Sequence, residues 1–449
     1  MRSIQEDILK SITYNFNGLN SFLLKANLWP GMLYGFSYQK NKKKSGGLNT
    51  EERLVKITNH AIKSVPYYTR LYSSPVSGIE DFGQKIGFID RQIVASHQDD
   101  FVSQSVNLKK YTSVTTGGTS GKPLRFQINK NRHAVELAFM HNLWKRAGWD
   151  NHTRGVLRNH HLPTNRDFII NPVTKEVIFD NFRLSHDYVK VINKVLKRYN
   201  IRYFHAYPSA AYEFCKLSRD AGMDLSFISA FLCGSESVLD FQKALITDEM
   251  GIRIFSWYGH SEKLVLGGYC EYSDHYHIES EYGYFELVDE HGIRITEPGK
   301  VGEIVGTTYY NYGMPLIRYR TGDYAEYVGD MCDACKRKML LIKNIQGRWE
   351  NNRIYKIDGT YISTTALNLH SDLYSYIDGL QYVQKRPGEL RVLIIKNQTF
   401  NTNYEQLFRD HFQKSFGSDN QVMIDYVDKL IINPNGKFEL LISNNKKIN

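Results

Sequence analysis

The sequence lacks a run of about 20 apolar residues, so it predicts no helix that spans a membrane. Its N-terminal stretch MRSIQEDILKSITYNF carries acidic residues early and has no apolar signal core, which predicts that the chain is not exported. The five cysteines are an odd number, and in a chain without an export signal they favour a reducing cytoplasm over disulfide bonds. Internal repeats are absent, and KNKKK is the only low-complexity tract. These absences predict a cytoplasmic protein.

The net charge of +10 is moderate and permits more than one kind of partner. Basic proteins often bind nucleic acid or anionic lipid. The lysines are scattered apart from the cluster at 40–44, and no nucleic-acid-binding signature is present, so nucleic acid is not expected as a partner. The segment FLLKANLWPGMLYGF precedes that cluster and leaves contact with a membrane surface open. We favour a helix packed on the core and a solvated loop, because charge runs are usually solvated.

The chain is rich enough in apolar residues (42%) and aromatic residues (13%) to form sizeable cores. Its 449 residues suggest about three domains, or two of unequal size. Helical patterns alternate with short apolar strands such as RYFHAY and FISAFLCG, which predicts an α/β core. From about Tyr282 the segments YGYFELVD, EIVGTTYY and DYAEYVGD read as strand after strand, which predicts a β-rich part. The last hundred residues read as a small α+β domain.

A glycine-rich stretch, YTSVTTGGTSGKPLRF, lies at 111–126. Its flanks read as strands, so the loop is expected at the tip of a hairpin. A Walker A loop is excluded, because Thr116 stands where its first Gly is needed and Pro123 follows the lysine. Glycines that turn N–H groups inward, hydroxyls and a lysine suit a phosphate cradle, although a structural turn remains the alternative. The cradle residues would be Thr115, Thr116, Gly117, Gly118, Thr119, Ser120, Gly121 and Lys122.

The cysteines and histidines form two groups that together offer a metal-ligand set. Cys332 and Cys335 make a C-x2-C pair, and Cys270 lies upstream with His275 and His277 close behind it. Two cysteines plus a Cys/His pair are the ligands of a closed tetrahedral zinc site. The gap of about sixty residues makes this weaker than a finger motif. A redox pair is the alternative, but no thioredoxin-like βαβ pattern surrounds it.

Four further motifs follow the loop in order: Gly234-Ser235-Glu236; Tyr258-Gly259-His260-Ser261-Glu262; Arg318-Tyr319-Arg320-Thr321-Gly322-Asp323; and Gly347-Arg348, with Asn435-Gly436-Lys437 near the end. In this order and spacing they resemble the adenylate-forming superfamily of acyl-CoA synthetases and adenylation domains. The closest resemblance is to the phenylacetate–CoA ligase family and its capsule-biosynthesis relatives, and it covers nearly the whole chain. The stretches VPYYTRLY and FIDRQIVASHQDDF also resemble that branch.

The resemblance implies an enzyme with two half-reactions. In the first, a carboxylate attacks the α-phosphate of ATP and gives an acyl-adenylate and pyrophosphate. In the second, a thiol or an amine displaces AMP. The protein would mainly position the reactants and neutralise phosphate charge. The implied substrates and cofactors are a small carboxylic acid, ATP, Mg²⁺, coenzyme A and a structural Zn²⁺.

The resemblance also implies a role for each motif. The cradle would hold the β- and γ-phosphates, and Glu262 would carry Mg²⁺, a hard cation that prefers carboxylate oxygens. Asp323 would accept hydrogen bonds from the ribose, and Arg348 would reach the ribose or a phosphate. Lys437 would bridge the attacking carboxylate and the α-phosphate. Tyr258 would stack on adenine, and Gly234, Ser235 and Glu236 would line the purine. The neighbouring Gly259, His260 and Ser261 would also belong to the cofactor-binding site.

By the same resemblance, residues 1–346 would form the large N-terminal domain, with its β-rich subdomain, and 347–449 a small C-terminal domain that rotates between the half-reactions. The acidic residues usual after Gly-Arg are replaced by Trp349-Glu350-Asn351, so Glu350 is a candidate pivot. The capsule-associated branch implies a zinc set of Cys270, His277, Cys332 and Cys335, with His277 preferred to His275.

Three alternatives stay open at this stage. The acyl acceptor is expected to be the thiol of coenzyme A. An amine of an amino acid or sugar, in surface polysaccharide biosynthesis, is the rival. A non-catalytic nucleotide-binding adaptor is a further possibility. The acid and the oligomeric state are not predicted, and acid selection is expected between about His205 and Gly268.

Overall fold

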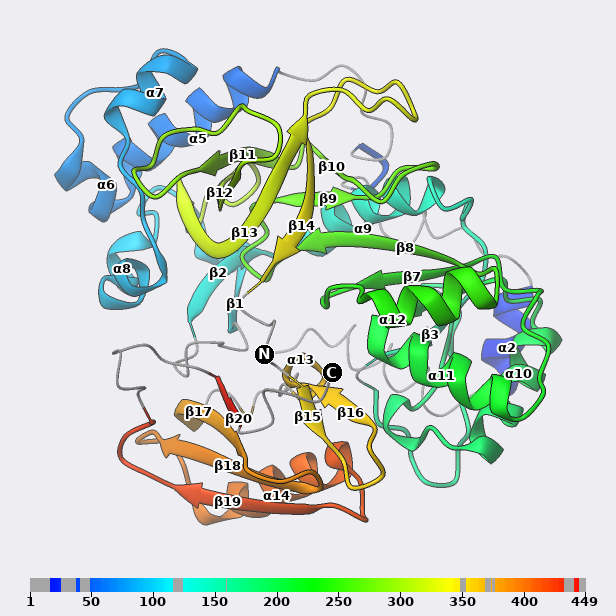
Figure 1. The fold of residues 1–449 in the computed structure, drawn as a ribbon. Helices are drawn as coiled ribbons and strands as arrows, with labels where there is room; N and C mark the ends of the chain where they lie inside the picture. The colour runs from blue at the N-terminus through cyan, green and yellow to red at the C-terminus, as the bar shows by residue number, and fades with distance from the viewer. Residues whose placement is uncertain are drawn as a thin grey trace.

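The computed structural model describes residues 17–25, 38–40, 49–115, 124–158, 160–347, 353–367, 373, 376–431 and 440–443. It has a large N-terminal α/β domain and a separate, smaller C-terminal α+β domain, which confirms the fold class that the sequence predicts (Figure 1). The boundary at 346/347 stays a prediction, because 348–352 lie outside the described residues.

One mixed sheet of twelve strands runs through the large domain, in the order β11-β12-β13-β14-β10-β9-β8-β7-β6-β3-β5-β4. Figure 1 labels β3 (Arg154–Leu157), β7 (Ala230–Gly234) and β8 (Arg253–Gly259) on its right-hand side. The strands β4 (Ile169–Asn171), β5 (Glu176–Ile178) and β6 (Tyr203–Ala206) belong to the same end of the sheet. The others are β9 (Leu266–Gly268), β10 (Tyr276–Ile278), β11 (Gly283–Val288), β12 (Val301–Thr308), β13 (Tyr319–Gly329) and β14 (Leu341–Gln346).

Strands β5, β3, β6, β7 and β8 are parallel to their neighbours in that order. They read as nearly continuous apolar runs because both faces of this part of the sheet are covered. Along β7, Phe231 and Cys233 face one core, whereas Ala230 and Leu232 face the other. The period of two therefore decides which core each side chain joins.

Helices cover both faces of this sheet. The helices of the large domain are α2 (Asn17–Lys25), α5 (Thr50–Ser64), α6 (Pro66–Leu71), α7 (Ile79–Lys85), α8 (Arg91–Ser96), α9 (Arg132–Lys145), α10 (His186–Arg198), α11 (Pro208–Asp220) and α12 (Asp240–Lys243), with a π-helical turn η4 (Ala244–Glu249) and 3₁₀ turns η1 (Gln98–Phe101), η2 (Leu108–Lys110) and η3 (Asn181–Arg183). Helix α10 shows why the sequence folds this way: the Ser185 hydroxyl caps its N-terminus, and Lys197 and Arg198 lie in its last turn.

Strand β1 (Tyr111–Thr115) pairs antiparallel with β2 (Arg125–Asn129), so that Thr115 lies opposite Arg125. This confirms the predicted hairpin on either side of the glycine-rich loop. The β-rich part predicted from Tyr282 is also confirmed, because β11, β12 and β13 pair antiparallel in sequence order.

The C-terminal domain contains the hairpin β15 (Arg353–Tyr355) and β16 (Tyr361–Ser363) and a four-stranded sheet in the order β19-β18-β17-β20. Its remaining elements are α13 (Thr364–Leu367), β17 (Ile377–Gln384), β18 (Glu389–Lys396), α14 (Thr402–Phe416), β19 (Gln421–Tyr426) and β20 (Leu441–Ser443). Phe408, Phe412 and Phe416 of α14 are fully buried against this sheet. Their i, i+4, i+8 spacing makes one apolar stripe on the helix.

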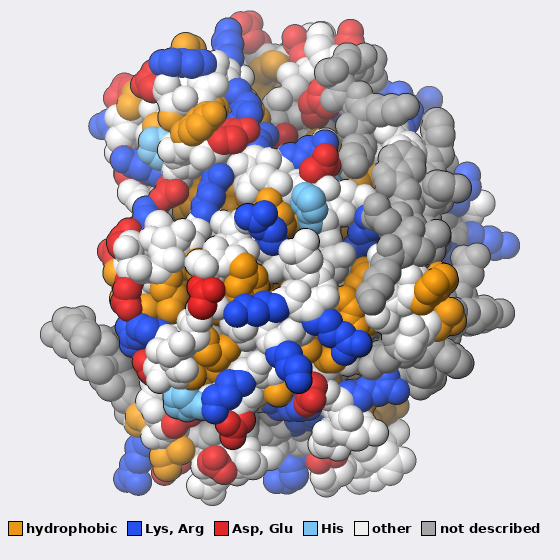
Figure 2. All heavy atoms as spheres, turned by 90° about the vertical axis from the view of Figure 1, so that its right-hand side faces the viewer, with side chains coloured by type: hydrophobic (Ala, Val, Ile, Leu, Met, Phe, Trp, Pro, Cys, Tyr) orange, Lys and Arg blue, Asp and Glu red, His pale blue; other side chains and the backbone are white. Residues whose placement is uncertain are grey.

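Figure 2 shows the face of the molecule over α10 and α11, where basic side chains are interspersed with acidic and apolar ones. The positive charge is therefore not collected into one unbroken patch on this face. In the part of the chain that the structure describes, no helix has both the length and the apolar content to cross a membrane.

Candidate functional site

The first two motifs meet at the carboxyl edge of the parallel strands. Gly234 ends β7 and lies opposite Trp257 of β8. A Cβ at Gly234 would come within 2.5 Å of the Trp257 ring, so this close approach requires glycine. Ser235 follows with a left-handed φ of 69°, which turns the chain sharply at the end of the strand. In open α/β sheets this edge is where ligands bind.

The third motif reaches the same place. The Tyr258 hydroxyl donates a hydrogen bond to Asp323 Oδ2 at 2.8 Å, and both residues are buried. Burial, followed by the nearby Asp323 carboxylate, raises the pKa of Tyr258 well above its usual value, so this hydroxyl keeps its proton. Tyr319 donates to Glu262 Oε1 at 3.3 Å, and His260 Nδ1 lies 3.6 Å from Glu262 Oε2. The structure therefore gathers Tyr258, Glu262 and Asp323 around one point.

The residues predicted to bind the purine enclose little space in this structure. A cavity of about 30 Å³ lies among eight residues, including Ser235, Glu236, Trp257, Tyr258 and Gly259. That volume suits one or two water molecules rather than a purine. The structure brings the predicted residues together, but the cavity among them would have to widen to hold adenine.

A buried polar network fixes the loop that carries Glu262. Lys263 adopts a left-handed φ of 60° and donates from Nζ to Glu136 Oε1 at 2.7 Å. Tyr282 donates to the other Glu136 oxygen at 2.8 Å, and Arg132 donates to the Lys263 carbonyl at 3.0 Å. Burial pushes the pKa of Glu136 upward, but the charges of Lys263 and Arg132 outweigh it, so the pKa is lowered overall. Glu136 is thus held as a carboxylate beneath the Glu262 loop.

Several predicted residues lie outside the described residues. They include cradle residues 116–122, Arg348, Glu350 and Lys437. Thr115 is described only as the last residue of β1. Their roles stay predictions.

The four predicted zinc ligands come together from two distant segments. One ligand atom from each of Cys270, His277, Cys332 and Cys335 lies within 4.8 Å of the other three. His277 is the histidine of this cluster, and His275 is not, as the resemblance implies. The distance of 3.3 Å between Cys335 Sγ and His277 Nε2 shows how closely the two segments approach.

The surroundings of this cluster fit a structural zinc ion. Backbone N–H groups of Tyr272 and Ser273 point at Cys270 Sγ from 3.3 and 3.2 Å, which suits a thiolate. His277 Nδ1 lies 3.0 Å from the His275 carbonyl oxygen. This bond fixes the tautomer that leaves Nε2 free as a ligand. With three sulfurs and one imidazole nitrogen, the donor set is that of a closed zinc site.

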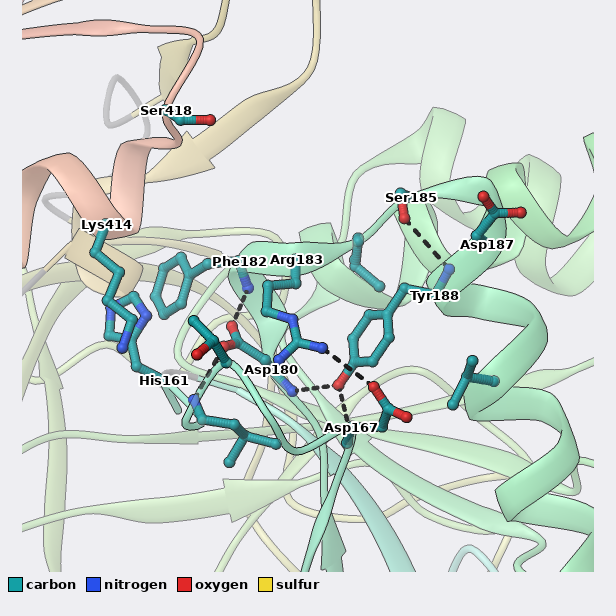
Figure 3. A pocket seen from close by; sticks show the side chains of 14 residues that line it. His161, Asp167, Asp180, Phe182, Arg183, Ser185, Asp187, Tyr188, Lys414 and Ser418 are labelled. Carbon is teal, nitrogen blue, oxygen red and sulfur yellow. Dashed lines mark hydrogen bonds and ion pairs between the residues drawn. The ribbon is translucent and has the colours of Figure 1, made fainter.

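A larger cavity, of about 720 Å³, lies between the two domains (Figure 3). The large domain lines it with the segments that follow β3 and β5, and the C-terminal domain contributes Lys414 and Ser418. Charged groups of both signs surround it, among them Asp167, Arg183 and Lys414. Its volume is in the range of small-molecule sites.

His161 ties the two domains together at this cavity. Its Nε2 lies 2.8 Å from Ser415 Oγ of α14, and its ring stacks on Phe182 with a centroid separation of 4.1 Å. Burial, then the charge of Lys414, lowers the pKa of His161 to about 3, so the ring is neutral at physiological pH. The structure thus places His161 at the domain interface.

Sequence reasoning missed two charged residues of the site, Glu136 and Arg158. Neither lies in a motif. Glu136 lies on α9 and reaches Lys263, which is 127 residues away in the sequence. The only sequence feature that could have singled out Glu136 is its position as a glutamate in a mostly apolar helix.

Comparisons with known proteins show which proteins the chain is similar to. Residues 354–444 match the family described as "CapK C-terminal domain". The chain is 21% identical to "Protein CapK" of Staphylococcus aureus over 374 residues, which cover 80% of this chain and 79% of that protein.

Two solved structures of a 2-hydroxyisobutyryl-CoA ligase have a similar fold. One is in the postadenylation state with R3-HIB-AMP. Its match covers 90% of this chain and 95% of the ligase chain at 15% identity, with a TM-score of 0.55. The other is in the thioesterification state with 2-HIB-AMP and CoA. Its match covers 87% of this chain and 88% of the ligase chain at 17% identity, with a TM-score of 0.56. These findings confirm the resemblance drawn from the motifs: the chain has the fold of the adenylate-forming ligases, and its C-terminal residues 354–444 match the CapK C-terminal domain.

Proposed function

We propose that this protein is an ATP-dependent ligase that activates a carboxylic acid as an acyl-adenylate and then transfers the acyl group to an acceptor. The observation that carries the proposal is the meeting of Tyr258, Glu262 and Asp323 at the carboxyl edge of the sheet. Residues that are up to 65 positions apart converge there on the edge where nucleotides bind in this class of sheet.

In the first half-reaction Asp323, Tyr258 and Glu262 each have a separate role. A carboxylate oxygen of the acid bonds to the α-phosphorus of ATP, the bond from that phosphorus to the bridging oxygen breaks, and pyrophosphate leaves. Asp323 holds the ribose hydroxyls, and the Tyr258 hydroxyl orients the aspartate. Glu262 is buried, its neighbour Lys263 is anchored to Glu136, and the Glu262 carboxylate would face the phosphates. Glu262 would hold Mg²⁺, which supplies charge neutralisation at the phosphate oxygens.

In the second half-reaction the acceptor bonds to the carbonyl carbon, AMP leaves with the electron pair, and the acceptor loses its proton. We propose the thiol of coenzyme A as the acceptor, as in the thioesterification-state structure that shares this fold. The cysteine–histidine cluster would hold a structural zinc ion that braces β9, β10 and the 332–335 turn and takes no part in the chemistry.

An amine acceptor, which would give an amide in surface polysaccharide biosynthesis, is the second candidate. Two observations favour it: the match to CapK, and the charged groups of both signs that line the interdomain cavity. Charged groups of both signs at a cavity can pair with the carboxylate and ammonium groups of an amino acid or with the ammonium group of an amino sugar.

The test is pyrophosphate exchange into ATP, screened over aryl, fatty, amino and uronic acids. Exchange that depends on one class of acid supports the proposal, and Glu262→Gln should abolish most of it. Glu290→Gln, a substitution of a glutamate whose side chain is 87% exposed, is the matched control. The enzyme is then given its acid with either coenzyme A or amines, and the product mass identifies the acceptor. A chain that supports no exchange with any acid contradicts the proposed function.

A further inference from the structure

Arg158 lies at the same sheet edge as the nucleotide motifs, directly after β3. Leu157 pairs with Ala206 of β6, which in turn pairs with Cys233 of β7. The guanidinium group reaches back along the edge, where its Nη2 donates to Ser235 Oγ at 3.0 Å. Ser235 also lines the small cavity beside Tyr258. Arg158 is therefore joined to the nucleotide site by one hydrogen bond.

Among the described residues, no carboxylate balances the charge of Arg158. Within the part of the chain that the structure describes, it forms no ion pair with any Asp or Glu; its other contacts are His205 Nε2 at 2.9 Å and the ring of Tyr207 at 4.7 Å. Glu236, on the neighbouring loop, accepts instead from the backbone N–H of Ser209 at the N-terminus of α11. A half-buried guanidinium without a counter-ion costs stability, since its desolvation is not offset by a paired charge.

Arg154, at the other end of β3, shows the contrast. Its guanidinium is 2.5 Å from Glu176 and also donates to the Thr174 carbonyl at 3.2 Å. Among the described residues, a carboxylate therefore neutralises Arg154, and none neutralises Arg158. The unbalanced one faces the ligand-binding edge.

His205 adds a second group that lacks a partner. Its Nε2 takes part in the bond with Arg158, while its Nδ1 is sealed from solvent without a hydrogen-bond partner among the described residues. Burial, then the positive charge of Arg158, lowers the pKa of His205 well below its usual value, so the ring is neutral. Nε2 accepts from arginine, and Nδ1 therefore carries a hydrogen that nothing accepts. The rings of Trp144 and Trp257 enclose this imidazole at 5.3 and 5.2 Å.

We propose that Arg158 binds a second anionic group on the acid that the enzyme activates, so that the preferred substrates carry a carboxylate or a phosphate in addition to the reacting carboxylate. The planar guanidinium, which lies over the ring of Tyr207, carries its donors in a fork that can pair with two oxygens of one anion. This inference rests on the proposed function and narrows its class of substrate. Arg158 is a specificity-determining residue in this reading, because it contacts the distal end of the acid.

The experiment compares acids that differ only in their distal group: succinate with succinamate, glutarate with glutaramate, and 3-phosphoglycerate with glycerate. Pyrophosphate exchange is measured for the wild type, Arg158→Met, Arg158→Lys and the control Arg154→Met. The wild type should use at least one anionic member better than its neutral partner by about tenfold or more in kcat/KM, the scale of a charge-assisted hydrogen bond. The loss in Arg158→Met should fall mainly on KM for the acid.

The controls separate binding from folding. Arg158→Met should keep or raise the Tm of the ligand-free protein, whereas Arg154→Met should lower the Tm and keep the preference for an anionic acid. Arg158→Lys should retain part of that preference. The dicarboxylate and phosphate pairs distinguish the two kinds of anion.

Three results would overturn the proposal: neutral partners used as well as the anionic acids, a preference that survives in Arg158→Met, or no anionic acid that is used or bound. If no acid of any class supports exchange, the proposed function fails. Calorimetric titration of the same pairs into wild type and Arg158→Met then still decides whether Arg158 binds an anion.

Discussion

Glu136 offers the sharpest test of how the fold supports the chemistry. It is a half-buried carboxylate that accepts from Lys263 Nζ at 2.7 Å and from the Tyr282 hydroxyl at 2.8 Å. Glu136→Gln keeps the shape and one acceptor oxygen but removes the charge. Lys263 would then lose its only ion-pair partner among the described residues, and the left-handed turn beside Glu262 would lose its anchor.

The expected cost follows from these contacts. A hydrogen bond to a charged group contributes about 1.5–3 kcal/mol, and Lys263 is one-third exposed, so the lower half of this range is expected. Because folding lowers the pKa of Glu136, its carboxylate stabilises the protein above the unfolded-state pKa of about 4.3. That contribution is lost as the pH falls through the lower folded pKa. The stability difference between wild type and Glu136→Gln should therefore be largest near neutral pH and should shrink in acid.

The assay is urea unfolding at several pH values, combined with pyrophosphate exchange as a function of Mg²⁺ concentration. Glu136→Gln should raise the Mg²⁺ concentration that gives half-maximal exchange, since the Glu262 loop is less well held. Glu290→Gln on the surface should change neither measurement. Equal stability and equal Mg²⁺ dependence for Glu136→Gln and wild type would refute the reasoning.

Three further predictions concern groups that the motifs single out. Purified protein should contain about one zinc per chain by elemental analysis, and Cys332→Ser should lower stability more than exchange activity; a metal-free, equally stable and active preparation contradicts this. Lys122→Ala and Thr119→Ala should each weaken ATP use by about 1.5–3 kcal/mol in kcat/KM, and unchanged kinetics would return the loop to a structural turn. Lys437→Ala should cut acyl-adenylate formation by roughly 10²-fold but still transfer the acyl group from preformed adenylate, so an equal fall in both half-reactions would count against its role.

Much of the fold could be predicted, because local patterns decide it. The apolar runs AFLCG and YFHA are strands in the sequence and are fully or mostly buried parallel strands in the structure. The hairpin at 111–129 followed from β-branched flanks and turn chemistry, and its register places Thr115 opposite Arg125. Strand order could not be predicted, because β3, β6, β7 and β8 become neighbours only through helical crossovers whose length leaves several arrangements open.

The site was predicted as far as motifs reach. Tyr258 and Asp323 were assigned by resemblance, and their hydrogen bond shows that the two motifs do meet. In the described residues His277, and not His275, lies in the cluster with the three cysteines. Arg158 and Glu136 were not predicted, because a single charged residue has no sequence signal for its partner. Their significance depends on which charges the fold brings near them.

The sheet edge orders the reactants, if the proposed function is correct. Tyr258 ends β8, Ser235 follows β7, Arg158 follows β3, and the segment after β5 lines the interdomain cavity. Neighbouring strands lie about 4.8 Å apart, so the ends of β8 and β3 are separated by roughly 14 Å. The nucleotide would lie at the β7–β8 part of this edge, and Arg158, whose guanidinium reaches back to Ser235, would hold the distal anion of the acid beside it. Lys414 and Ser418 lie at the cavity that the segments after β3 and β5 line. Rotation of the C-terminal domain would therefore rebuild the acceptor side while the contacts among Tyr258, Glu262 and Asp323, all within the large domain, stay in place.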